Sequence, residues 1–212
     1  MPFGYIGQNQ TKQKVKNTGV LSSFDISLLE KKGQAGGSLE FIQSQTISST
    51  VAQVDFTSIK ENLYDVHLLV LKKMTTENDN KRVTLRFFES GTIETATVYH
   101  HSSFVLEAGG SAADVRTTSS NDIRITDNTG NGTDENCNTY VYLYNLGNSS
   151  KYSYTTSHSV LLNSSPTMVM EWGGGVLPQA STVDGIRVLG SGSENLTAGN
   201  VKLYGVKHIW VT

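Results

Sequence analysis

The sequence runs Val183-Asp-Gly-Ile-Arg-Val188 and then, after a bend rich in Gly, Ser and Asn, Val201-Lys-Leu-Tyr-Gly-Val206. In both stretches apolar residues take alternate positions, which is typical of strands with one buried face. The bend between them predicts that the two strands form a β-hairpin. Because a hairpin cannot bury its apolar face alone in water, these strands need partners from the rest of the chain.

The chain upstream of this pair has the same strand-like character. The stretch at residues 64–74 contains a nearly continuous apolar run, Val66–Leu71, which predicts a central strand buried on both faces. In residues 139–147 three tyrosines alternate with aliphatic residues, so the tyrosines share one face of a strand. Polar residues dominate 107–122 and 127–138, and we predict that both are surface loops. The remaining predicted strands cover residues 38–48, 50–59, 81–91, 93–106, 122–126, 151–163 and 167–175.

These elements predict an all-β fold, an antiparallel two-sheet sandwich of jelly-roll type. No helical pattern separates the strands, which excludes a parallel α/β sheet. A length of 212 residues fits one such domain, which we place at residues 24–212. One helical turn is predicted at its start, over residues 24–32. Residues 1–23 have neither helical nor strand periodicity, so they predict an extended N-terminal arm that becomes ordered on a partner.

Charge and hydropathy limit the partners of the chain. It carries 17 Lys and Arg against 19 Asp and Glu, a net charge of -2, and has no basic stripe, so we expect no nucleic-acid partner. No segment approaches the length of a membrane span. The N-terminal residues also lack the apolar core of a signal peptide. We therefore expect synthesis in the cytoplasm and no membrane partner.

The sequence contains no familiar catalytic motif, and we expect neither enzymatic activity nor a cofactor. The loop that begins at Asp127 is faintly similar to a calcium loop. Asn138, however, stands where a bidentate Glu is needed, so no metal site is expected there. His100 and His101 are neighbours on a predicted strand and cannot both face one metal ion.

Carboxylates and the single cysteine leave some chemistry open. Glu171 and Asp184 could form the acid pair of a glycosidase, but surface carboxylates without a catalytic role are far more common. Cys137 lies beside a predicted strand, where a small buried thiol is more common than a nucleophile. As the only cysteine of the chain, it also excludes an intrachain disulfide.

Aromatic residues give the sequence one candidate ligand surface. If enough of them face solvent, they form a platform for sugars, with Tyr142 and Trp172 as the contacts. At strand spacing, tyrosines more often form one half-buried face of a sheet, and composition does not decide between the two. The residues concerned are Tyr140, Tyr142, Tyr144, Tyr152, Tyr154 and Trp172.

Several longer motifs run through the chain. They are YIGQ at residues 5–8, YDVHLLVL at 64–71, YLYNLGNSSKYSY at 142–154, VDGIRV at 183–188 and LTAGNVKLYGVK at 196–207. With these motifs the chain resembles small virion structural proteins of tailed phages from marine bacteria, cyanophages among them. The resemblance covers most of the chain. It implies a jelly-roll domain that is displayed on the particle, as head decoration or as part of a tail fibre.

The resemblance implies a non-enzymatic virion protein that is made in the host cytoplasm and assembled into the particle. Its expected partners are other virion proteins and further copies of itself, with a trimer favoured. The arm would attach it to the particle through Phe3, Tyr5, Ile6 and Val15. One alternative is a host-recognition module that binds cell-surface carbohydrate. A polysaccharide depolymerase is the least supported alternative.

Overall fold

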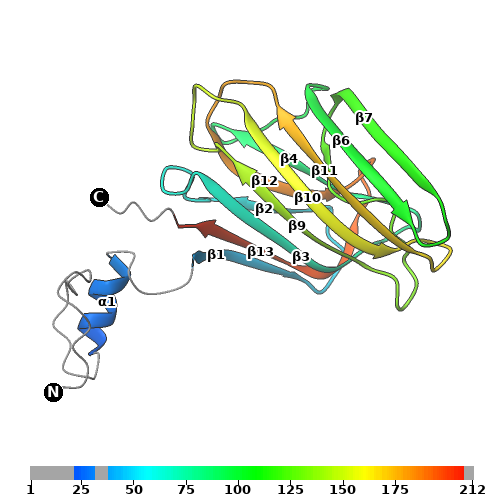
Figure 1. Ribbon diagram of the computed structural model, residues 1–212, viewed down its shortest axis with the longest axis horizontal. Coiled ribbons are helices and arrows are strands. Elements are labelled where there is room, and N and C mark those ends of the chain that lie inside the picture. Colours follow the sequence, from blue (N-terminus) through cyan, green and yellow to red (C-terminus); the bar gives the residue numbers. More distant parts are fainter. Residues whose placement is uncertain (1–21, 32–37, 208–212) are drawn as a thin grey trace, which may run out of the picture. The chain divides into compact units, whose positions relative to one another are not determined.

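A computed structural model describes residues 22–31 and 38–207 of the chain (Figure 1). The chain divides into two units, and residues Leu39–His208 form the larger one. The smaller unit contains helix α1, Ser23–Lys31, which confirms the helix predicted at residues 24–32. The residues predicted to attach the arm, Phe3, Tyr5, Ile6 and Val15, lie outside the described residues.

The larger unit is an antiparallel β-sandwich, so the prediction of an all-β, two-sheet fold is confirmed. Figure 1 shows the two sheets, with the blue strand β1 at one edge of the larger sheet and the green strand β7 at the other. In spatial order, the eight-stranded sheet consists of β1 Leu39–Ile47, β13 Leu196–Val206, β3 Val66–Thr76, β9 Cys137–Tyr144, β10 Ser153–Leu162, β11 Met168–Leu177, β6 Tyr99–Glu107 and β7 Ala112–Ser120. The five-stranded sheet consists of β2 Gln53–Thr57, β12 Val183–Gly190, β4 Val83–Glu89 and β5 Thr92–Ile93, with β8 Ile123–Arg124 also paired to β4.

The predicted C-terminal hairpin is wrong. Strand β12 pairs with β2 and β4, whereas β13 pairs with β1 and β3, so residues 191–195 carry the chain from one sheet to the other. Ile186 and Val188 enter the core from one sheet, Val201 and Leu203 enter it from the other, and all four are fully buried. Alternation reports only that one face of a strand is buried. Two strands that face each other across a core have this pattern just as two neighbours in one sheet do.

Strand β3 lies between β13 and β9, which confirms its predicted central position. Its inward side chains, His67, Leu69 and Leu71, are buried in the core. Of its outward residues, Leu68 is buried, but Val66 and Val70 are only half-buried. The prediction of burial on both faces is therefore only partly right, because no second layer covers the outer face of this sheet among the described residues of the larger unit.

Strand β7 lies within residues 107–122, which the sequence predicted to be a loop. It is an edge strand that pairs with β6, and most of its side chains are exposed on both faces. The segment is low in hydrophobicity because this edge strand lies beyond the core and buries few of its side chains. The predicted strand over residues 93–106 is also divided, because residues 94–98 turn between β5 and β6.

Candidate functional site

The outer face of the eight-stranded sheet carries most of the exposed aromatic side chains of the sandwich. Because strand residues alternate between faces, the even-numbered residues of β6, β9, β10 and β11 point outward. Trp172 is 41% exposed and Tyr140 is 45% exposed, far more than core aromatics such as Phe87 at 0%. The tyrosines that the sequence placed on one strand face are therefore on the solvent side of the sheet.

Four of these side chains form a row across four neighbouring strands. Tyr140 of β9 lies opposite His158 of β10, His158 lies opposite Trp172 of β11, and Trp172 lies opposite Phe104 of β6. The Tyr140 hydroxyl is 3.1 Å from Nδ1 of His158, and the rings of Phe104 and Trp172 have centroids 5.2 Å apart. The row is thus a continuous aromatic ridge, because each ring contacts the next.

The two residues predicted to contact sugar come together in this region. Tyr142 and Trp172 line one shallow hollow of about 710 Å³ with Tyr140, Thr156, His158 and Met170. Phe104 and His158 also belong to this aromatic face, although neither was predicted to do so. Alternation along their own strands assigns both to the outer face, but only the pairing register places them beside Trp172.

A second hollow of about 690 Å³ lies on the same face. Its lining includes His100, Ser102, Arg116, Tyr154 and Gly174. The outward residue Gly174 has no side chain, and a Cβ there would lie 2.7 Å from the carbonyl oxygen of Thr155. The glycine therefore leaves the floor of this hollow without a side chain.

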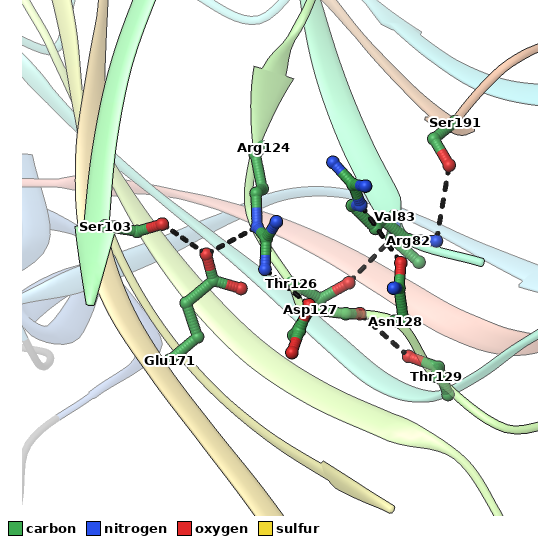
Figure 2. Close-up of polar contacts among 10 residues, drawn as sticks. All are labelled: Arg82, Val83, Ser103, Arg124, Thr126, Asp127, Asn128, Thr129, Glu171 and Ser191. Atoms are coloured by element: carbon green, nitrogen blue, oxygen red, sulfur yellow. Dashed lines mark hydrogen bonds and ion pairs between the residues drawn. The ribbon is translucent and has the colours of Figure 1, made fainter. Parts of the chain in front are cut away.

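The inner face of β11 carries a buried ionic cluster, which Figure 2 shows. Glu171 accepts hydrogen bonds from Nε of Arg124 at 2.7 Å and from the Ser103 hydroxyl at 2.5 Å. Arg124 also donates to the carboxylate of Asp127. Glu171 is 2% exposed, so it cannot act with Asp184 on a polymer substrate at the surface. Burial raises the pKa of the Glu171 carboxyl, although the charge of Arg124 opposes this.

Further hydrogen bonds hold the residues after Arg124 (Figure 2). The Thr126 hydroxyl accepts a hydrogen bond from the backbone N–H of Val83 at 2.9 Å, and Arg82 donates from Nε to the side-chain oxygen of Asn128 at 3.0 Å. The polar side chains that make this loop similar to a calcium loop have a structural role instead. They hold the loop against the start of β4, as the hydrogen bond between Arg82 and Asn128 does. In residues 22–31 and 38–207, no group of three or more His, Cys, Asp or Glu side chains could hold a metal ion.

The single thiol is buried in the core, with Cys137 at 0% exposed. Burial raises the pKa of the Cys137 thiol to about 12. Since the thiolate is the reactive form, we expect the folded protein to react with a disulfide reagent such as DTNB at least about 10³-fold more slowly than free cysteine does. The check is the labelling rate at pH 8, with the guanidinium-unfolded protein as the control that reacts with one equivalent. Labelling of the folded protein at the free-cysteine rate would contradict this placement.

No protein family model, curated protein or solved structure matches the chain. In the part of the chain that the structure describes, no helix is long and apolar enough to cross a membrane. The fold and the candidate site therefore define this chain as an antiparallel β-sandwich with an aromatic, solvent-facing sheet surface.

Proposed function

We propose that this chain is a non-enzymatic structural protein of a tailed-phage particle. In this proposal it is a jelly-roll unit displayed on the head or tail and anchored by its N-terminal arm. The sequence motifs that resemble phage virion proteins support the particle assignment. The observation that carries the proposal is the nested pairing order of the strands.

The nested order is visible when the strands are taken from both ends of the chain. The first strand β1 pairs with the last strand β13, and β2 pairs with β12. Further in, β3 pairs with β9, and β4 pairs with β8. A long antiparallel ribbon that folds over on itself produces such pairs, alternately in the two sheets, and this is how an eight-stranded jelly roll is built. The strand order therefore supports the finer assignment within the β-sandwich class.

Two insertions widen one sheet of this arrangement. Strands β10 and β11 are inserted between β9 and β12, and strands β5, β6 and β7 are inserted between β4 and β8. Four of the inserted strands extend the larger sheet beyond β9. The widened sheet offers the exposed apolar and aromatic surface that assembly with other virion proteins, or with further copies of this chain, requires.

Removal of the arm tests the proposed attachment. We expect a protein that lacks residues 1–23 to retain the cooperative unfolding of the sandwich but to be absent from assembled particles, because the core cluster found among the described residues lies within residues 42–203. The measurement is the amount of the truncated protein in purified particles, relative to the full-length protein expressed at the same level. Normal incorporation of the truncated protein would contradict the attachment role. Antibody-gold labelling of particles that carry the full chain then separates a head position from a tail position.

Binding of host-surface carbohydrate is a second candidate function. The observation that favours it is the common hollow of Tyr142 and Trp172 on the solvent face of the sheet. A host-recognition module would expose this face to the host surface. In a purely structural protein, neighbouring proteins of the particle would cover the face on assembly. Binding of the intact chain to polysaccharide therefore distinguishes the two.

A further inference from the structure

The two hollows on the outer sheet face are neighbours, because Thr156 of one lies opposite Gly174 of the other, and we call the two together the trough. Its floor is a row of small side chains, because Thr156 of β10 lies opposite Gly174 of β11, and Gly174 lies opposite Ser102 of β6. Larger side chains close the row at both ends, with Tyr142 opposite Thr156 and Arg116 opposite Ser102. Tyr142 and Arg116 are four interstrand spacings apart, which corresponds to about 19 Å. This length suits several units of a linear polymer.

Rows of larger side chains form the two walls. One wall is the aromatic ridge of Tyr140, His158, Trp172 and Phe104, two residues along each strand from the floor. The other wall contains Tyr154, which lies opposite Val176, and His100, which lies opposite Val176 on the other side. Since the walls are four residues apart along each strand, they are about 13 Å apart. The trough therefore has the width of one polymer chain.

The chemistry of the trough is aromatic at the walls, hydroxyl-bearing on the floor and uncharged overall. Arg116 is the only charged residue among those that line the two hollows, and it forms an exposed pair with Asp114 at 3.3 Å. The side chains of this pair are 80% and 63% exposed, so the pair is weak and both groups can exchange partners with a ligand. A guanidinium that donates and a carboxylate that accepts together suit adjacent sugar hydroxyls.

We infer that this trough binds a single chain of an uncharged polysaccharide, with sugar rings packed against Trp172 and Tyr154. A pyranose ring has faces of C–H groups and a rim of hydroxyls, which match the aromatic walls and the polar floor respectively. The inference rests on the second proposed function and assigns its ligand class and its place on the sheet.

The test uses the full chain and named polymers. We expect affinity electrophoresis to show retardation by at least one of dextran, mannan and a mixed-linkage β-glucan. Trp172→Ala and Tyr154→Ala should each weaken that binding by about tenfold or more, as expected for aromatic side chains that carry most of the contact. Ser102→Trp, which fills the floor at an exposed position, should abolish binding while the thermal unfolding of the variant stays close to that of the parent chain.

Tyr152→Ala is the matched control, because Tyr152 is 44% exposed against 45% for Tyr154 but lines neither hollow. Equal loss in the Tyr152 and Tyr154 variants, or no retardation by any of the three neutral polymers, would overturn the inference. Binding only to the anionic polymer alginate, lost in Arg116→Ala, would overturn the ligand class.

Self-association is a separate outcome of the same experiment. If Trp172→Ala converts an oligomer into a monomer in light scattering and no neutral polymer binds, the face is a contact between copies of the chain and the inference is overturned. The structural role on the particle would stand in that case, because particle incorporation is measured independently with the arm deletion.

Discussion

Arg124→Met is expected to lower the free energy of unfolding by about 3–5 kcal/mol, the usual cost of removing one partner from a buried ion pair. The side chain of Arg124 is 6% exposed and that of Glu171 is 2% exposed. One carboxylate oxygen of Glu171, Oε2, already has no hydrogen-bond partner, so the variant would leave a buried charge with only Ser103 to stabilise it. Urea unfolding at pH 7 measures the effect.

Two control variants separate the buried pair from a general effect of losing an arginine. Arg116→Met removes an arginine whose side chain is 80% exposed, and we expect a change within about 1 kcal/mol. The double variant Arg124→Met with Glu171→Leu should lose less stability than Arg124→Met alone, because the uncompensated charge is removed. If the double variant loses as much as the single variants combined, the two side chains are not coupled.

The cost of Arg124→Met is also expected to fall as the pH is lowered. Burial raises the folded-state pKa of Glu171, and the positive charge of Arg124 opposes that rise, so its removal raises the pKa further. A carboxyl with a folded pKa above the unfolded value gains protons on folding. Its contribution to stability is therefore largest at low pH and is lost as the pH rises through the folded pKa. Unfolding free energies of the variant and parent chain at pH 5 and pH 8 test this sign.

Phe87→Ala is expected to cost about 3–5 kcal/mol of unfolding free energy, because it opens a cavity in the core. Phe87 lies on β4, is fully buried, and its ring contacts Tyr99 at a centroid distance of 6.3 Å. The backbone N–H of Phe87 also donates to the Tyr99 hydroxyl at 3.0 Å, so a shift of β4 would disturb that bond as well.

Phe104→Ala is the matched control for the core variant. Phe104 is 39% exposed on the outer face of the eight-stranded sheet, so its removal opens no internal cavity. We expect the loss of stability to be less than half that of Phe87→Ala. Equal losses in thermal or urea unfolding would mean that Phe104 is covered in solution, for example by a second copy of the chain.

The strand content of the chain was predictable because alternation and polar turns are local properties. The run at residues 64–74 and the tyrosines of residues 139–147 were assigned to the right kind of element and, for the tyrosines, to one face. Helix α1 was also predicted, since its start and its glycine-rich end are both visible in the sequence. These features depend on neighbours within a few residues.

The pairing of the strands was not predictable in the same way. Strands β12 and β13 were expected to pair because they are consecutive, but they belong to different sheets. Strand β7 was expected to be a loop because a strand without a buried face loses the apolar pattern by which strands are recognised. Both errors concern where a strand lies relative to the core, which a local pattern does not contain.

The candidate site was likewise predictable only in part. Tyr142 and Trp172 were named from the sequence, and the structure places both at one hollow. The role of Gly174 as the low point of the trough was not visible, because a strand's own sequence does not show which residues of its neighbours lie beside it. Only the pairing register sets Gly174 between Thr156 and Ser102.

The sequence by itself determined that this protein is built of strands, which faces of those strands are apolar, and that tyrosines share one face. The tertiary structure decided which strands are neighbours, that the aromatic face is the outer one, and that Arg124 and Glu171, 47 residues apart, form a buried pair. The physical reason is that alternation is fixed by the backbone geometry of each residue. Pairing, in contrast, is a competition among many distant partners that is settled only when the whole core is packed.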